Sequence, residues 1–292
     1  MSTIALLSPI TQPLRVDAHH HLWNYDPLEY AWITDEMRAI RRSFLETDLS
    51  AELRSARVDL AVAVQARQSL EETRWLLNCA HSTPRIAAVV GWLPLDADNL
   101  SEHLDAMHDP RLAGLRHIVQ AEPDSFLDNP AFNRGISSLS ARGLTYDLLV
   151  YERQLPEAIR FVDRHPNQPF VLDHAAKPRI AAGELEPWAT NLRELARRPN
   201  VHCKLSGLVT EANWSAWTLE TLRPYLDVCI EAFGTDRLLA GSDWPVCLLA
   251  VSYSGWWNLL EDFFSTFSRS EQQRIFGANA ISFYGLHRTE GQ

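Results

Sequence analysis

The sequence lacks the features that mark a secreted or membrane-bound protein. Its 292 residues include four cysteines, and no two of them form a CxxC pair. Isolated cysteines in a chain of this length indicate reduced thiols rather than a disulfide framework. No run of 18 or more apolar residues is present, and residues 1–13 lack the basic and long apolar regions of a signal peptide. We therefore expect a cytoplasmic protein in which residues 1–13 form a leader or an edge element.

Concentrated positive charge is also missing. The chain has 27 Lys and Arg against 37 Asp and Glu, a formal net charge of −10, and no run of basic residues. Nucleic acids and anionic membrane surfaces both attract clustered positive charge, so neither is expected as a partner. No internal repeat or Pro/Gly-rich linker divides the chain, and residues 14–292 are therefore predicted to form one domain.

Short apolar runs alternate with amphipathic stretches along the whole sequence. Near-continuous apolar strands that alternate with helices are typical of a parallel sheet buried on both faces, and eight such units predict a closed α/β barrel, the (β/α)₈ or TIM-like fold. The predicted strands are Leu14–Ala18, Leu60–Val64, Ile86–Gly91, Gly114–Val119, Leu144–Val150, Phe170–Leu172, Val201–Leu205 and Leu238–Ala240. The predicted helices include Ser69–Ala80, Leu100–Met107, Pro130–Ala141, Leu155–Arg164, Trp188–Ala196, Thr221–Phe233, Gly255–Phe267 and Ser270–Phe276.

The segment from Trp23 to Ala56 interrupts this alternation and contains several aromatic residues. We expect it to be an elaborated first loop over the barrel mouth. In a parallel α/β barrel the catalytic residues lie at the C-terminal ends of the strands and in the loops that follow. We therefore expect the site residues at those positions.

His19 and His21 follow the first predicted strand as an HxH pair. Residues i and i+2 of a strand point to the same face, so both imidazoles can reach one point in the barrel mouth. Two neutral imidazoles there suit a divalent metal or the polarisation of a carbonyl. The alternative is a hydrogen-bonded surface cluster, which the position on the first of eight barrel strands disfavours.

His174 and Asp243 follow the sixth and eighth predicted strands. A lone histidine is more often a core residue and a lone aspartate a turn cap, but both lie at the same barrel end as the HxH pair. Facing inward, His174 would add a third imidazole, and a buried Asp243 would be a candidate base with a perturbed pKa.

The same residues stand in longer motifs. These are Val-Asp-Ala-His-His-His-Leu-Trp from residue 16, Leu-Asp-His-Ala-Ala-Lys-Pro from 172, Cys-Lys-Leu-Ser-Gly-Leu from 203, Gly-Ser-Asp-Trp-Pro-Val from 241, and Asn279-Ala280 with Phe283-Tyr284. In this order they resemble the metal-dependent amidohydrolase superfamily, in the amidohydrolase 2 branch that contains sugar lactonases and 2-pyrone-4,6-dicarboxylate lactonase. The resemblance covers Val16 to Leu286. Further segments, such as Val64-Gln65-Ala66-Arg67 and the stretch from Lys204 to Glu211, are similar to L-fucono-1,5-lactonases.

The resemblance implies a role for each candidate residue. His19, His21 and His174 match the histidines that bind metal or polarise the carbonyl, and Asp243 matches the general base. Members with two metals bridge them by a lysine or glutamate near the end of the fourth strand, where this chain has Arg116 and His117. The resemblance therefore implies at most a single divalent ion, such as Zn²⁺, held by His19, His21, His174 and Asp243. The dicarboxylate lactonases are understood to work without metal, so the ion can be dispensable for activity.

The expected reaction is the hydrolysis of a sugar (aldono) lactone, with the L-fucono-1,5-lactone type first among the substrates. Candidate substrate contacts at the strand ends are Trp32, Gln65, Arg67, Trp92, Arg116, His117 and Trp244. Each of them has a packing or salt-bridge role as its alternative. Asp147 is expected to be structural, and Lys204 either binds substrate or pairs with a neighbouring carboxylate.

Two other functions stay open from the sequence. One is a metal-dependent decarboxylase, or a hydrolase of a carboxylated pyrone or muconolactone, which needs a cationic clamp that Arg67 and Arg116 could supply. The other is a non-catalytic sugar-binding barrel, which has no need of a buried carboxylate opposite three imidazoles.

Overall fold

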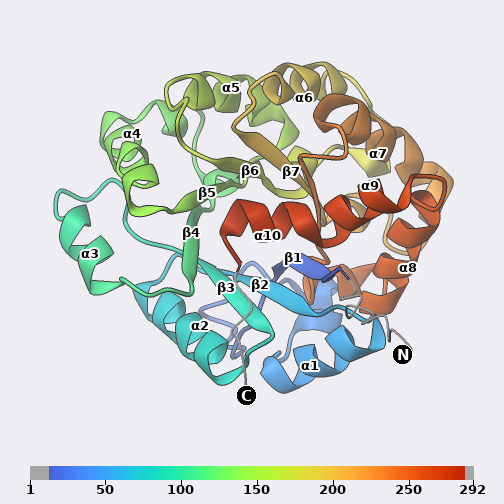
Figure 1. Cartoon of the computed structure of the whole chain (residues 1–292), viewed down its shortest axis with the longest axis horizontal. Coiled ribbons are helices and arrows are strands. Elements are labelled where there is room, and N and C mark those ends of the chain that lie inside the picture. The colour runs from blue at the N-terminus through green and yellow to red at the C-terminus, as the bar shows by residue number, and fades with distance from the viewer. Residues whose placement is uncertain (1–12, 287–292) are drawn as a thin grey trace, which may run out of the picture.

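The chain forms a near-closed barrel of eight parallel strands surrounded by helices (Figure 1). The computed structural model describes residues 13–286. Each strand pairs with the next along the chain, in the order β1 to β8. The strands are β1 (Val16–His20), β2 (Leu60–Val64), β3 (Ile86–Gly91), β4 (Leu112–His117), β5 (Thr145–Leu148), β6 (Phe170–Leu172), β7 (Val201–Leu205) and β8 (Leu238–Ala240). The predicted fold is confirmed; the predicted leader, apart from Pro13, lies outside the described residues.

One α-helix follows each strand, and two more close the chain. They are α1 (Glu46–Ser55), α2 (Leu70–Ser82), α3 (Leu100–Ala106), α4 (Pro130–Ser137), α5 (Leu155–Asp163), α6 (Trp188–Ala196), α7 (Leu219–Phe233), α8 (Tyr253–Phe263), α9 (Arg269–Gln273) and α10 (Asn279–Tyr284). Side-chain caps fix several starts, since Ser69 accepts from the backbone N–H groups of Glu71 and Glu72, and Asn129 accepts from that of Ala131. Among residues 13–286, no helix is both long and apolar enough to cross a membrane.

Several predicted boundaries are wrong. The first strand is Val16–His20 rather than Leu14–Ala18, and the fifth is Thr145–Leu148 rather than Leu144–Val150. Three further differences have local reasons. The fourth strand ends at His117 rather than Val119, because a 3₁₀ turn begins at Val119. Residues 46–55 of the supposed first loop form α1, which the pattern missed because only Leu49 and Leu53 of this polar helix are buried. The final predicted helix ends at Gln273, after which the chain makes a π-helical turn over Arg274–Ala278 before α10.

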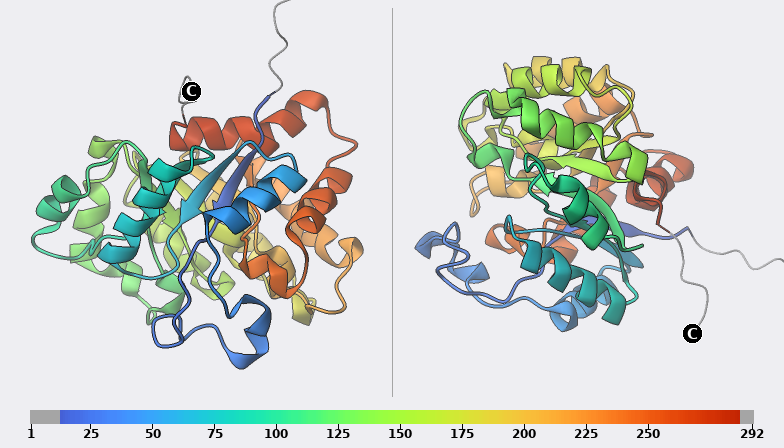
Figure 2. Two further views of the ribbon diagram at one scale, coloured as in Figure 1. Left: turned by 90° about the horizontal axis from the view of Figure 1, so that it is seen from below. Right: turned by 90° about the vertical axis from the view of Figure 1, so that its left-hand side faces the viewer.

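The two ends of the barrel are covered by different parts of the chain. α10 lies across the centre of the ring of strands at one end (Figure 1), and residues 24–45 of the first loop extend from the opposite end (Figure 2). The loop is anchored by an antiparallel bridge between Trp23 and Phe44. Because β1 points its C-terminus toward that loop, the loop marks the C-terminal face, where the candidate residues lie.

The barrel interior is apolar at the end covered by α10 and polar at the C-terminal end of the strands. Small aliphatic side chains from five strands pack together with Ala280, Tyr284 and Leu286 next to α10. Val16 and Ala18 belong to this cluster, yet His19 also faces inward, where it contacts Lys204 of β7. The register of β1 against β2 shifts between Asp17 and His20, and this irregularity breaks the simple alternation of faces. It turns His19 and His21 into the barrel mouth.

Candidate active site

Three imidazoles surround one carboxylate at the C-terminal end of the barrel. Oδ1 of Asp243 lies 3.3 Å from Nε2 of His21, 3.7 Å from Nε2 of His19 and 3.9 Å from Nε2 of His174. The two Nε2 atoms of the HxH pair are 3.2 Å apart. All four side chains are buried, with exposures of 5% or less. The residues predicted from β1, β6 and β8 therefore meet at one point.

The backbone at this point is held in unusual conformations. His174, Ala175, Ala176 and Lys177 all have positive φ angles, and so does Asp243, although none of them is glycine. Such left-handed conformations cost free energy and persist only where surrounding structure holds them. The turn after β6 thus brings His174 inward at an energetic cost, which is common at functional sites.

Gly207 supports the same arrangement by leaving space. A Cβ atom at this position would lie 2.6 Å from Nδ1 of His174 and 3.2 Å from Oδ2 of Asp243. Its φ of +66° is also one that glycine adopts without strain. The loop after β7 therefore packs directly on the histidine and the carboxylate.

Asp17 joins the two strands at the seam of the barrel. Its buried carboxylate accepts hydrogen bonds from the backbone N–H of Ser242 at 2.8 Å, from the Ser242 hydroxyl at 2.6 Å and from Tyr253 at 3.0 Å. The backbone N–H of Asp243 donates to the carbonyl of His19 at 2.8 Å, and that of His21 to the carbonyl of Trp244 at 2.6 Å. These bonds fix β1 against the segment after β8, and so set the distance between the HxH pair and Asp243. Sequence reasoning did not assign this role to Asp17.

Burial keeps the imidazoles of His19 and His174 neutral. It lowers the pKa of His174 to about 4, and burial together with the charge of Lys204 holds the pKa of His19 well below its ordinary value. For Asp243, burial alone raises the pKa, but the facing histidines His174, His21 and His19 outweigh it and lower the pKa. At neutral pH the ionised carboxylate of Asp243 therefore faces the neutral imidazoles of His19 and His174.

These donors fit a single divalent cation. Nδ1–H of His21 donates to the carbonyl oxygen of Val64 at 2.7 Å, which directs the lone pair of its Nε2 toward Asp243. Oδ1 of Asp243 has no hydrogen-bond partner among residues 13–286 although it is buried. Ligand atoms of His19, His174 and Asp243 all lie within 4.8 Å of one another. Imidazole nitrogens and a carboxylate oxygen are ligands that Zn²⁺ prefers.

We expect one Zn²⁺ to bind per chain and to raise the thermal midpoint by several degrees. A ligand at 100 times its Kd stabilises the native state by about 2.7 kcal/mol. Removing one imidazole in His174→Gln should abolish this shift, whereas His81→Gln, at a half-exposed surface histidine, should retain it. Thermal unfolding with and without Zn²⁺, together with metal analysis by mass spectrometry, measures both. An equal shift in His174→Gln would place the ion elsewhere.

A buried ionic network lies beneath the imidazoles. The Lys204 ammonium contacts Asp147, lies 2.9 Å from Oδ1 of Asp173 and 3.1 Å from Nδ1 of His19, and is fully buried. Nη1 of Arg116 donates to Oδ2 of Asp173 at 3.0 Å, and Tyr284 of α10 donates to Asp147. Of the two roles left open for Lys204, the structure shows the pairing with carboxylates, and Asp147 is its partner.

Two of the predicted substrate contacts lie next to the imidazoles. Nη1 of Arg116 is 3.4 Å from Nε2 of His19. The side-chain N–H of Gln65 donates to the backbone carbonyl of Arg116 at 3.1 Å, while its Oε1 is buried and has no hydrogen-bond partner within residues 13–286. Arg116 and Gln65 therefore remain the best placed of the predicted contacts.

The other predicted contacts have protein partners, and their roles toward substrate stay predictions. The Trp92 indole donates to Nδ1 of His117 at 3.2 Å, and Nε2 of His117 lies 2.7 Å from Glu122. Trp244 is buried against Phe44, with ring centres 5.2 Å apart. Trp32, 40% exposed, packs edge-on against Trp23 in the first loop.

Arg67 forms ion pairs with Glu29 and Glu72 and lies over the ring of Tyr30. Glu72 in turn accepts hydrogen bonds from the backbone N–H groups of Ala66 at 3.1 Å and Arg67 at 2.7 Å. The carboxylate thus organises the loop after β2, which also carries Gln65. Burial raises the pKa of Glu72 to about 7, against these hydrogen bonds.

This raised pKa predicts a pH-dependent stability. Between pH 4.5 and 7 the native state keeps a proton that the unfolded chain has released, so the free energy of unfolding falls as pH rises through that window and levels off above it. Glu72→Gln retains an oxygen for both backbone N–H groups but does not ionise. Between pH 5 and 7.5 its free energy of unfolding should therefore fall by roughly 2–3 kcal/mol less than that of the wild type. Urea unfolding at the two pH values measures the difference. Parallel losses in both proteins would show that Glu72 ionises normally.

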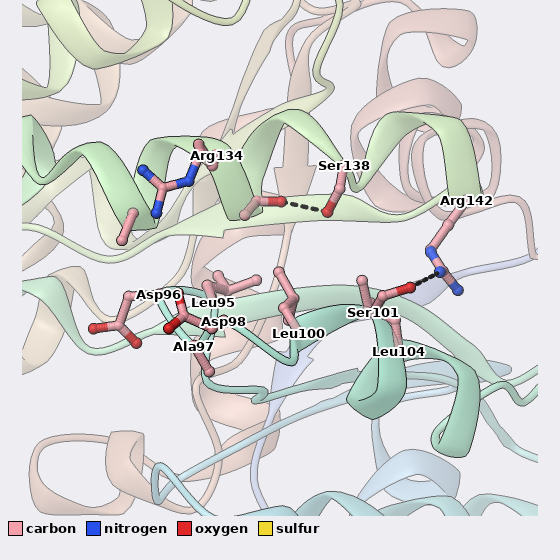
Figure 3. Close-up of a pocket in the computed structure, with 12 residues that line it drawn as sticks. Leu95, Asp96, Ala97, Asp98, Leu100, Ser101, Leu104, Arg134, Ser138 and Arg142 are labelled. Carbon is pink, nitrogen blue, oxygen red and sulfur yellow. Dashed lines mark hydrogen bonds between the residues drawn. The ribbon is translucent and has the colours of Figure 1, made fainter.

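A separate cleft between α3 and α4 has a volume of about 240 Å³ (Figure 3). It is lined by Leu95, Asp98, Arg134 and Arg142 among others, and Arg142 donates a hydrogen bond to Ser101 across it. None of the predicted site residues lines this cleft. The cleft is therefore separate from the candidate active site.

Comparisons with known proteins identify the family and the relatives of this chain. A family model described as Amidohydrolase matches residues 16–286. The chain is 42% identical to an L-fucono-1,5-lactonase of Burkholderia multivorans, over 94% of this chain and 96% of that protein, and 38% identical to one of Burkholderia ambifaria, over 95% and 97%. A crystal structure of an amidohydrolase from Burkholderia multivorans with bound zinc superposes with a TM-score of 0.92 at 42% identity, covering 94% of this chain and all of that one.

Proposed function

Because the chain belongs to the amidohydrolase family, we propose that it hydrolyses a sugar lactone of the L-fucono-1,5-lactone type to the sugar acid. The observation that carries the proposal is the Asp243 carboxylate facing three imidazoles in a buried barrel mouth. Identity of 42% and 38% to two L-fucono-1,5-lactonases, over nearly the full length, supports the substrate class. The partner implied is a small neutral molecule.

Asp243 acts as the general base in this proposal. It accepts a proton from a water molecule, and that water attacks the lactone carbonyl carbon. The protonated carboxyl then returns the proton to the ring oxygen as the C–O bond breaks. A lactone is an activated ester, so a placed base and carbonyl polarisation are sufficient chemistry.

The imidazoles and Arg116 stabilise the negative charge that develops on the carbonyl oxygen. His19, His21 and His174 are buried, so an N–H of His19 or His174, or a cation held by the three imidazoles, acts in a medium of low dielectric constant. When bound by these residues and Asp243, Zn²⁺ supplies Lewis-acid polarisation of the carbonyl. Arg116, already oriented by Asp173, adds a fixed positive charge beside His19.

The alternative with a carboxylated substrate requires a free cationic clamp. Both arginines suggested for that clamp are paired, Arg67 with Glu29 and Glu72, and Arg116 with Asp173. This pairing favours a neutral lactone over a pyrone dicarboxylate or a decarboxylase substrate.

A pH-indicator assay on a panel of lactones tests the proposal. The panel contains L-fucono-, D-arabinono-, L-galactono-, L-rhamnono- and D-glucono-lactones and 2-pyrone-4,6-dicarboxylate. We expect efficient turnover of the L-fucono and D-arabinono members. Turnover of the dicarboxylate alone would be consistent with the site assignment but would contradict the proposed substrate. No turnover of any member would favour a decarboxylase.

A further inference from the structure

An ion pair stands beside the imidazole cluster and has no part in the chemistry described so far. Lys177 follows the left-handed turn that carries His174, and Glu211 ends the 3₁₀ turn η8 (Leu208–Glu211) that begins after Gly207. Nζ of Lys177 lies 3.7 Å from Oε1 of Glu211, and the two side chains are 19% and 23% exposed. Both side chains of the pair are thus partly accessible to solvent.

Lysine is rare in this chain, so a lysine at position 177 is unusual. The chain has 27 basic residues, of which only Lys177 and Lys204 are lysines. Lys204 is fully buried beneath His19. Lys177 is therefore the single lysine whose ammonium reaches solvent, and its Nζ lies 5.6 Å from the centre of the Tyr151 ring, which helps to hold it.

Both members of the pair stand on loops that carry or contact the catalytic groups. Lys177 is three residues from His174, and its charge is one of the causes that lower the pKa of His174. Burial and then the charge of Asp243 raise the pKa of Glu211, against the effect of Lys177. η8 itself follows Gly207, which packs on His174 and Asp243.

A hollow opens next to Glu211 on the same face. It has a volume of about 500 Å³ and is lined by Glu36 of the first loop, by residues 212–215 and by Leu249. These residues come from the loops after β1, β7 and β8, which meet at the C-terminal face. The hollow therefore adjoins the loop that carries Glu211, although neither Lys177 nor Glu211 lines it.

One donor and one acceptor at this separation suit a substrate hydroxyl group. A separation of 3.7 Å is too long for a direct hydrogen bond, so a third group can bond to both ends. A hydroxyl accepts from an ammonium and donates to a carboxylate at the same time, whereas a substrate carboxylate can only accept. Glu211 and Asp243 would repel a substrate carboxylate at this position.

We propose that Lys177 and Glu211 together bind ring hydroxyls of the lactone and make the enzyme specific for polyhydroxylated neutral substrates. This inference rests on the proposed function, since it names the part of the sugar lactone that the pair contacts. The pair is a specificity determinant, separate from the hydrolytic machinery.

The test compares one substrate that has hydroxyls with one that lacks them. For Glu211→Gln and Lys177→Met, kcat/KM on L-fucono-1,5-lactone should fall about ten- to a hundredfold, the effect of losing a hydrogen bond to a charged group. On δ-valerolactone, which has the same ring ester and no hydroxyl, it should stay within about twofold, because the hydrolytic groups are intact. The control is Glu184→Gln, which breaks an exposed ion pair with Arg179 on the loop after β6 and should change neither value.

Protection of Lys177 gives a second readout that needs no variant. An amine-reactive reagent should modify Lys177 but not Lys204, and L-fuconate, the product acid, should slow this modification when peptides are analysed by mass spectrometry. Equal losses of kcat/KM on both lactones would overturn the assignment of the pair, and so would a rate of Lys177 modification that is the same with and without L-fuconate. Neither result would contradict the lactonase proposal. A wild-type enzyme inactive on every sugar lactone would overturn both.

Discussion

Replacing Asp243 with asparagine is expected to lower kcat for lactone hydrolysis by about three orders of magnitude, within the range that general-base catalysis supplies. The amide cannot take the proton from water, but it keeps the size of the side chain and an oxygen facing the imidazoles. Asparagine also tolerates the positive φ of 57° at this position, so the backbone should not change. Steady-state kinetics on the lactone that the panel identifies measure the loss.

The matched control is Asp98→Asn, which makes the same chemical change at an exposed carboxylate in the remote cleft. It should leave kcat and KM unchanged. Binding of the product acid, measured by calorimetry, should survive Asp243→Asn, because binding does not need the base. If the variant retained the wild-type hydrolysis rate, Asp243 would not be the general base, and the imidazoles would be the remaining candidates.

Lys204→Met should lower the free energy of unfolding by about 3–5 kcal/mol. The ammonium is fully buried between Asp147 and Asp173, and methionine fills its volume without its charge. Two carboxylates would then face each other at low dielectric with only Arg116 left to neutralise one of them. Urea unfolding followed by circular dichroism measures this loss, and displacement of His19 should lower kcat as well.

A double variant separates lost charge balance from lost packing. Adding Asp147→Asn to Lys204→Met removes one unpaired carboxylate and keeps an acceptor for the Tyr284 hydroxyl. We expect it to recover roughly half of the lost stability, since the removal of one partner of a buried pair is what costs most. A single variant within about 1 kcal/mol of the wild type would show that the network carries little net stability.

The sequence by itself determined the barrel and the positions of its chemistry. β2, β3, β6, β7 and β8 begin and end where the apolar runs predict, because strands buried on both faces are continuous in hydrophobicity. Since all parallel strands end on the same face, His19, His21, His174 and Asp243 could be placed together before any coordinates were known. Family motifs in the same order added the reaction class.

Only the tertiary structure decided how these groups are held. The shift in β1 that turns His19 inward, and the left-handed turn from His174 to Lys177 without a glycine, have no signal in local sequence because surrounding contacts impose them. The same holds for the Lys177–Glu211 pair and for Lys204 between its two aspartates, whose partners are more than 30 residues apart in the chain. Such pairs depend on which loops meet at the barrel mouth, and hydrophobic periodicity carries no information about that.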